Sequence, residues 1–204
     1  GGVDGGAGAE ESGSVLVLSA DGKGVVMRRE GLREATRKKA DKSRTKLSKR
    51  LSKGEKRNRK RMATVAAVYT IRPFARTPEQ VASELHPVGE DSPRRPRPEN
   101  KRVWASVEKG PEPVIKASFE EALRRDPGKK KAWVALVDGN KTQIELLQKF
   151  AASYGVTVVI MLDLIHVLEY VWKAAWALFP EGDPKAQGWV TERLLKILQG
   201  KSSH

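Results

Sequence analysis

The sequence predicts an α/β fold, in which a mixed sheet is flanked by helices. Three apolar, β-favouring runs come first, at residues 15–18, 25–27 and 62–71. Helix and strand patterns then alternate from residue 114 onwards. Strands joined by turns pair as antiparallel neighbours, whereas strands joined through a helix enter a sheet in parallel, so this order predicts a sheet of both kinds.

A lead-in and an interrupted strand open the chain. Residues 1–14 are rich in glycine and acidic side chains and have nothing to bury, so they are predicted to be flexible. The strand that begins at residue 15 is predicted to end at Asp21. The segment 21–24, Asp-Gly-Lys-Gly, has the composition of a turn, and residues 25–27 then form a second strand.

Proline marks the ends of elements in the middle of the chain. Pro73 stops the strand at 62–71. A proline follows the capping residue Thr77, which predicts a short helix that ends near His86. Residues 87–100 are rich in proline and arginine and are predicted to be a linker or an extended arm.

The second half of the chain has a regular order of elements. A helix, a strand, a helix, a strand and two helices follow one another, and the last strand is continuously apolar, as in a strand that is covered on both faces. These elements are predicted at residues 114–126, 132–137, 141–154, 156–162, 164–179 and 185–198.

This order of elements is that of a ribonuclease-H-like fold, whose first and fourth strands lie side by side at the centre of the sheet. Asp21 ends the first strand and Asp138 ends the fourth. Side chains at such strand ends converge, as ligand groups do where the strand order of an open sheet reverses. We therefore expect Asp21 and Asp138 to form one site, with carboxylates about 4 to 8 Å apart.

A pair of neighbouring carboxylates predicts a metal site. The two charges repel one another, and Mg²⁺ or Mn²⁺ is the usual compensation. Two such ions about 3.5–4 Å apart activate a water or a 3′-hydroxyl and stabilise the leaving oxygen of a phosphodiester. Asp-Gly is also a common turn dipeptide, which is the alternative explanation of both motifs. Their matching positions at the ends of two strands bring the metal site level with the turn as an explanation.

The composition limits the classes of protein. With 204 residues, of which 39% are hydrophobic, the chain can bury a core. It has no cysteine, which excludes disulfides and thiolate zinc sites, and with three histidines any metal is expected to have oxygen ligands. The longest apolar run, 156–168, is interrupted by Asp163 and His166, whereas a membrane span needs about 20 apolar residues. We expect a cytoplasmic protein that does not contact a membrane.

The net charge of +14 is concentrated in one segment. Residues 28–61 contain seventeen Lys or Arg and four acidic residues, and few apolar ones. This predicts an exposed helical segment that binds nucleic acid through its phosphates, independently of sequence. The alternative, a solvated helix face, normally comes with acids one turn away, and acids are scarce here. The candidate phosphate-binding residues are Lys38, Lys39, Lys49, Arg50, Lys53, Lys56, Arg57, Arg59, Lys60 and Arg61.

Four blocks of sequence carry a family resemblance. They lie at residues 19–27 (SADGKGVVM), 51–69 (LSKGEKRNRKRMATVAAVY), 97–104 (RPENKRVW) and 133–139 (WVALVDG). These blocks resemble the DDE transposases of ISKra-type bacterial insertion sequences. The resemblance implies a ribonuclease-H-like domain that cuts and joins DNA with two Mg²⁺ or Mn²⁺ ions held by Asp, Asp and Glu. It implies that Asp21 and Asp138 occupy the first two positions.

The third acid departs from the family pattern. Asp163-Leu-Ile-His166 is similar to a mark of several such families, a Cys or Asp followed by a His after the second catalytic Asp, with a structural or strand-handling role. A hydrogen-bonded core histidine is the alternative for His166. In these families a helical insertion and then a Gly-rich block with the catalytic Glu follow. Residues 164–204 are therefore expected to begin the insertion, and the third acid is expected beyond His204. Glu169 is the alternative third acid.

Three classes of function remain open at this stage. The first is DNA transposition by an oligomer assembled on DNA, with residues 15–163 as the catalytic core, interrupted by 28–61 and 87–100. The second is a ribonuclease-H-like nuclease that does not transpose. The third is a basic nucleic-acid-binding fragment without catalysis, such as the product of a decayed transposase gene. Without its third acid, the chain is expected to bind DNA but not to cut it.

Overall fold

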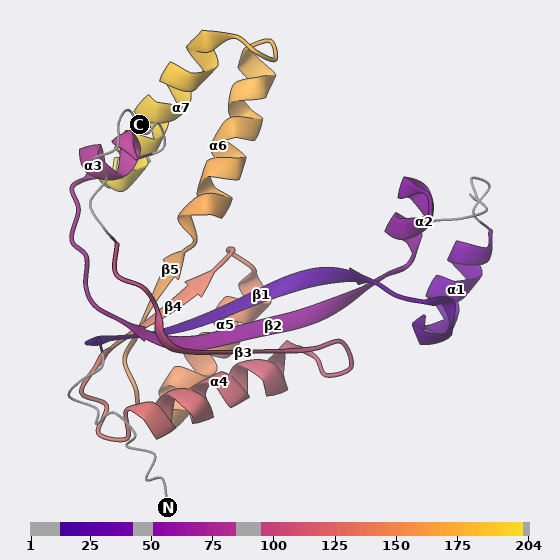
Figure 1. Ribbon diagram of the computed structural model, residues 1–204, viewed down its shortest axis with the longest axis horizontal. Helices are drawn as coiled ribbons and strands as arrows, with labels where there is room; N and C mark the ends of the chain where they lie inside the picture. Colours follow the sequence, from indigo (N-terminus) through magenta and orange to yellow (C-terminus); the bar gives the residue numbers. More distant parts are fainter. Residues whose placement is uncertain (1–12, 43–50, 85–94, 202–204) are drawn as a thin grey trace, which may run out of the picture.

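The computed structural model describes residues 13–42, 51–84 and 95–201, which contain a five-stranded mixed sheet (Figure 1). Across the sheet the order is β3-β2-β1-β4-β5. Strands β1, β4 and β5 are parallel, and β2 lies antiparallel to both β1 and β3. The predicted α/β class with a mixed sheet is confirmed. The strands are β1 (Val15–Val26), β2 (Lys60–Ile71), β3 (Glu99–Ser106), β4 (Ala132–Val137) and β5 (Val158–Leu162).

The helices fall into three groups in space (Figure 1). Helices α4 and α5 pack against one another and against the sheet, α6 and α7 form a hairpin beyond β5, and α1 and α2 lie at the far end of β1 and β2. The helices are α1 (Glu34–Asp41), α2 (Lys53–Asn58), α3 (Pro78–Ser83), α4 (Pro111–Arg125), α5 (Lys141–Tyr154), α6 (Leu164–Leu178) and α7 (Pro184–Leu198), with a 3-10 helix at Arg29–Gly31.

The main core lies between the sheet and helices α4 and α5. The fully buried Phe119 of α4 packs its ring 6.2 Å from Trp133 of β4, and 6.0 and 5.8 Å from Phe150 and Tyr154 of α5. The buried indole of Trp133 donates from Nε1 to Asp126 Oδ2 at 2.9 Å, so its polar atom is not left without a partner. These contacts fix β4, whose end carries Asp138, against both helices.

Strand β1 is longer than predicted, and the turn predicted at residues 21–24 does not exist. The strand runs unbroken from Val15 to Val26 and pairs along its whole length with β2. Gly22 and Gly24 lie within this ladder, opposite Thr64 and Met62, and neither has a positive φ. A long partner strand supplies backbone hydrogen bonds to an extended Asp-Gly-Lys-Gly segment, and this outweighs its local preference for a turn.

One strand was predicted wrongly from the sequence and another was missed. Residues 25 and 26 end β1 instead of forming a strand of their own, and β3 was not predicted. Strand β3 lies at the edge of the sheet with most of its side chains exposed and only Trp104 among its large apolar residues half-buried, so it lacks the alternation that marks a strand. It begins at Glu99, inside the predicted linker, of which residues 87–94 lie outside the described residues.

The later elements lie close to their predicted positions. Strand β4 and helix α5 have the predicted bounds, α4 begins three residues early at Pro111, and β5 begins two residues late at Val158. The prediction that β5 is covered on both faces is wrong for the described residues, because Val159 and Met161 are 55% and 49% exposed. Their side chains lie on the face opposite α4 and α5.

Helices α6 and α7 form a hairpin with its own small core of Ala175, Ala186 and Val190. Helix α3 packs against α7, and Gln199 Nε2 donates to Glu79 Oε1 at 3.1 Å. The helices predicted at 164–179 and 185–198 are confirmed. Within the described ranges, no helix has the length and apolar character needed to cross a membrane.

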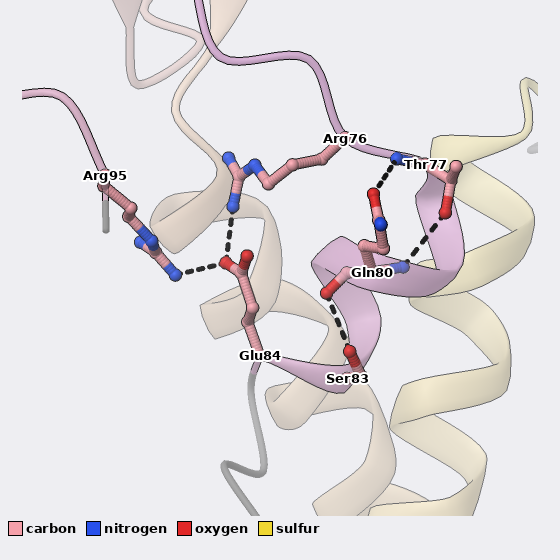
Figure 2. Close-up of polar contacts among 6 residues, drawn as sticks. All are labelled: Arg76, Thr77, Gln80, Ser83, Glu84 and Arg95. Carbon is pink, nitrogen blue, oxygen red and sulfur yellow. Dashed lines mark hydrogen bonds and ion pairs between the residues drawn. The ribbon is translucent and has the colours of Figure 1, made fainter. Parts of the chain in front are cut away.

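Helix α3 is held by reciprocal polar contacts (Figure 2). Thr77 Oγ1 accepts from Gln80 N, and Gln80 Oε1 accepts from Thr77 N, which is the capping box predicted in part from Thr77. At the other end of the helix, Glu84 forms ion pairs with Arg76 and Arg95. The carboxylate of Glu84 therefore links the segment before α3 to the segment that leads to β3.

Glu121 of α4 is a buried carboxylate shared by three arginines. Its Oε2 accepts from Arg102 Nη1 at 2.8 Å and from Arg124, and its Oε1 accepts from Arg125 Nε at 2.9 Å. Burial alone would raise the pKa of Glu121, but the hydrogen bonds from Arg124, Arg125 and Arg102 outweigh it and lower the pKa to about 2. The cluster joins the edge strand β3 to α4.

We expect Glu121→Gln to lower the free energy of unfolding at pH 7 by about 1 to 3 kcal/mol. Because the folded-state pKa lies below the ordinary value of 4.5, the stabilisation by Glu121 is present above pH 4.5 and is lost as the pH falls towards about 2. Urea unfolding at neutral pH and at about pH 2.5 measures this, with the exposed Glu120→Gln as control. A destabilisation of the same size at both pH values would contradict the assignment.

Candidate active site

Three aspartates lie level across the parallel strands. In the ladders, Leu136 of β4 pairs with Ser19 of β1 on one side and with Met161 of β5 on the other. An aspartate follows two residues after each of these three paired positions. Because the three strands are parallel, the aspartates lie at the same edge of the sheet. The three acids are Asp21, Asp138 and Asp163.

The aspartates lie on the open face of the sheet. Leu18 and Ala20 of β1 belong to the core beneath α4 and α5. Side chains alternate between the two faces of a strand, so Ser19 and Asp21 project from the opposite face. This face carries a cavity of about 230 Å³, whose lining includes Asp21, Asp138, Asp163, His166, Tyr69 and Lys101.

Local hydrogen bonds hold two of the carboxylates in place. Asp138 Oδ1 accepts from Asn140 N at 2.9 Å, and Asp163 Oδ1 accepts from Ile165 N at 2.9 Å as the N-cap of α6. The backbone N–H of Asp163 also donates to Val137 O at 2.8 Å. In both residues the second carboxylate oxygen, Oδ2, takes part in none of these contacts and is left for a ligand. The cap supports the structural role expected of Asp163.

Tyr69 of β2 and Lys101 of β3 form the opposite wall of the cavity. The pKa of the Tyr69 phenol is raised, first by burial and then by the negative charge of Asp163. The phenol therefore stays protonated at neutral pH and remains a hydrogen-bond donor. The Lys101 ammonium lies 5.7 Å from the centre of the Tyr69 ring, at the range of a cation–π contact, and adds positive charge beside the three acids.

Glu169 lies outside this cavity. Its Oε2 is 3.9 Å from Nδ1 of His166, which does line the cavity, whereas Glu169 itself does not. Within residues 13–42, 51–84 and 95–201, no three His, Asp or Glu side chains lie close enough together to hold one metal ion. The site offers the neighbouring pair Asp21 and Asp138, which fits the start of a metal site but supplies too few ligands to complete one.

No family model, characterised protein or solved structure matches this chain. Its function must therefore be inferred from the geometry and charge of the site.

Sequence reasoning found some residues of the site and missed others. It placed Asp21 and Asp138 on neighbouring parallel strands, which is confirmed, while the separation of their carboxylates and their role as metal ligands stay predictions. Asp163 was expected to have a structural or strand-handling role, although its position directly after a strand is the same signal that selected Asp138. Tyr69 and Lys101 were missed, because they reach the cavity only through the pairing of β2 with β1 and β3.

A larger groove of about 680 Å³ adjoins the cavity and shares Tyr69, Leu136 and Asp163 with it. Its lining also includes exposed apolar side chains of β5 and α6, and the ion-paired Arg76, Glu84 and Arg95 shown in Figure 2. A polymer that enters the cavity therefore has room to continue along the open face of the sheet, past two arginines that share one carboxylate.

The basic segment forms an arm at the end of β1 and β2 (Figure 1). The prediction of a helical segment over residues 28–61 is partly wrong. The described residues form the 3-10 helix, α1 and α2, while Lys60 and Arg61 belong to strand β2. They join β2 because its pairing with β1 extends to Val26. Lys49 and Arg50 lie outside the described residues.

Exposure separates two kinds of cation in the arm. Arg59 is only 17% exposed, and its guanidinium lies 3.9 Å from Glu55, which is 4% exposed. Arg59 is therefore partly buried beside Glu55, and its role as a phosphate ligand stays a prediction. The cations that are exposed, as predicted, are Lys38 and Lys39 of α1, Lys53, Lys56 and Arg57 of α2, and Lys60 at the start of β2.

Proposed function

We propose that this chain carries the two-aspartate part of a metal-dependent site that cuts and joins DNA, as in a DDE transposase. The observation that supports this most directly is the position of Asp21 and Asp138, on adjacent parallel strands in one cavity on the open face of the sheet. The strand order β3-β2-β1-β4-β5, with β2 antiparallel to its neighbours, supports a ribonuclease-H-like fold.

Each part of the cavity has a role in this proposal. Asp21 and Asp138 bind the ions, two in the complete enzyme, and Mg²⁺ or Mn²⁺ there supplies charge stabilisation for phosphoryl transfer. Lys101 attracts a phosphate to the cavity, and the protonated Tyr69 donates a hydrogen bond to one of its oxygens. Asp163 caps α6 and holds its first turn beside the cavity.

DNA is the proposed substrate, and the arm is its proposed binding element. Five exposed cations on α1 and α2, the helices at the far end of β1 and β2 in Figure 1, would hold DNA by its phosphates while one strand occupies the cavity. We propose that the complete protein acts in the cytoplasm as an oligomer on DNA. In this proposal α6 and α7 begin a helical insertion, and the third acid follows it.

A second candidate function is binding of nucleic acid without catalysis. It is favoured by one observation: among the described residues, no group of three His, Asp or Glu side chains forms a metal site. The charge of the arm would serve such a protein equally well. The two candidates differ in whether Asp21 and Asp138 matter for any reaction on DNA.

The test is a DNA-cleavage assay with Mn²⁺. The chain, and a longer version that continues into a Gly-rich block with a glutamate, are incubated with a labelled nicked duplex. We expect cleavage and strand transfer by the longer version and none by residues 1–204, because two aspartates leave one ion under-coordinated. If both versions bind the duplex and neither cleaves any phosphodiester, the non-catalytic candidate replaces this proposal.

Glu169→Gln tests the alternative third acid. We expect this substitution to leave the cleavage rate of the longer version unchanged within about twofold, because Glu169 does not line the cavity. The same assay measures it. Cleavage by residues 1–204 that disappears in Glu169→Gln would show that Glu169 completes the acidic site.

A further inference from the structure

A second cavity lies at the base of the arm, between α1 and β2. Its volume is about 250 Å³, which is large compared with the roughly 30 Å³ that a water molecule occupies. Arg33 and Thr36 line it from the α1 side, and Lys60 and Arg61 from β2, with Leu32 and Met62 as its apolar lining. The cavity therefore joins three cationic side chains and one hydroxyl in a space with ample room for a phosphate group.

No acidic side chain lines this cavity. Within the described residues, neither Arg33, Lys60 nor Arg61 forms an ion pair, whereas three of the four acids of the arm are paired with other cations. These pairs are Glu34 with Lys38, Asp41 with Arg29, and Glu55 with Arg59. The fourth acid, Glu30, does not line the cavity and, in the described part of the chain, forms no ion pair with its cations.

One of the lining arginines also has an unsatisfied polar atom. Arg61 Nε is buried and has no hydrogen-bond acceptor among the described residues, and the same holds for Arg37 Nε and Arg59 Nε. A buried donor without an acceptor destabilises a fold, more so when it is charged, unless it is compensated in the functional state. An anion in the cavity would supply both the acceptor and the missing negative charge.

We propose that this cavity binds a single phosphate group, and that its natural source is a backbone phosphate of nucleic acid. Arginine offers planar, paired donors that match phosphate oxygens, and the Thr36 hydroxyl donates one further hydrogen bond. A phosphate bound in this cavity fixes the position of the duplex relative to the arm. Contacts between the duplex and exposed, flexible lysines do not fix that position. That the duplex is DNA rests on the proposed function, while the anion site itself does not.

Inorganic phosphate tests the site in the absence of nucleic acid. We expect the melting temperature of the chain to rise with phosphate concentration, relative to chloride at equal ionic strength, because a ligand that binds only the folded state stabilises it. The rise should be lost in Arg61→Gln and in Arg33→Gln, and kept in Lys56→Gln, which removes an exposed cation of the arm from outside the cavity. Equal phosphate effects in all four proteins would overturn the proposal.

Duplex binding then tests the source of the phosphate. We expect Arg61→Gln to weaken duplex binding about tenfold and to lower the slope of log K against log salt by about 0.9. Arg61→Lys, which keeps the positive charge, should weaken binding less than Arg61→Gln does. The double variant with Arg33→Gln and Arg61→Gln should lose less binding free energy for the duplex than the sum of the losses in the two single variants, because both side chains hold one phosphate. Circular dichroism checks that each variant is folded.

The outcomes separate this inference from the proposed catalysis. A phosphate effect on melting with duplex binding unchanged in Arg61→Gln would refute nucleic acid as the source. Loss of duplex binding in Arg61→Gln no greater than in Lys56→Gln, with an unchanged phosphate effect, would refute the site as a whole. A chain that passes both tests but never cleaves DNA, even in its longer version, would refute the catalytic proposal and leave this one standing.

Discussion

Asp21→Asn and Asp138→Asn will each lower the rate of Mn²⁺-dependent DNA cleavage by on the order of 10³-fold or more in the version of the protein that cleaves. Both residues line the same cavity from neighbouring parallel strands, and in the proposed function a shared ion needs both carboxylates. Loss of one carboxylate removes a ligand and half of the negative charge that attracts the ion, which is worth several kcal/mol in the transition state.

Asparagine is the informative substitution because it keeps the shape of the side chain. In Asp138→Asn the amide oxygen still accepts from Asn140 N, so the turn after β4 is preserved while the charge is removed. The matched control is Asp183→Asn, since Asp183 caps α7 with the same hydrogen-bond geometry far from the cavity. Single-turnover cleavage rates and duplex affinity are measured together. Full cleavage by either active-site variant, at the wild-type Mn²⁺ concentration, would remove that aspartate from the site.

Asp163→Asn distinguishes a cap from a ligand in the same assay. Asp163 lies level with Asp21 and Asp138 but uses Oδ1 to cap α6. An amide oxygen retains the cap, so a structural role predicts a loss of less than about tenfold and an unchanged dependence on Mn²⁺. A rise in the Mn²⁺ concentration needed for half-maximal rate would instead make Asp163 a metal ligand.

Local signals in the sequence predicted the part of the fold in which neighbouring residues decide the structure. Strand β4 and helix α5 have the predicted bounds because the helix starts at the capping residue Asn140 and ends at Gly155, whose φ of 60° is a left-handed conformation that favours glycine. The parallel pairing of β1 with β4 followed from the order of elements, and with it the juxtaposition of Asp21 and Asp138.

The features that could not be predicted from the sequence depend on contacts between segments that are distant in the chain. Asp-Gly-Lys-Gly is a good local turn, but twelve consecutive pairs between β1 and β2 keep it extended and carry the arm outwards. Edge strand β3 has no apolar alternation to reveal it, so Lys101 could not be assigned to the cavity. The cavity at the base of the arm likewise depends on residues 32–36 and 60–62 lying around one space, which brings Arg33 and Arg61 together across 28 positions of sequence.

Neutralising the exposed surface of the arm will reduce DNA affinity by about 10³-fold or more at low salt. The variant replaces the five exposed cations of α1 and α2, namely Lys38, Lys39, Lys53, Lys56 and Arg57, with glutamine and leaves the cavity at the base of the arm intact. Arg59 is kept, because it is partly buried beside Glu55 and its removal would disturb the arm itself. Each lost phosphate contact should lower the slope of log K against log salt by up to about 0.9.

The affinity could fall because the net charge of the protein falls or because a specific DNA-binding surface is lost. A matched control variant distinguishes these two causes. It replaces five exposed lysines outside the arm with glutamine, namely Lys109, Lys116, Lys141, Lys173 and Lys185. Both variants have the same net charge, so a general electrostatic attraction would weaken equally in each. We expect the control to keep most of the affinity and nearly the whole slope, because the proposed contacts with DNA lie on the arm. Equal losses in the two variants, measured by fluorescence anisotropy across a salt series, would exclude the arm as the DNA-binding surface.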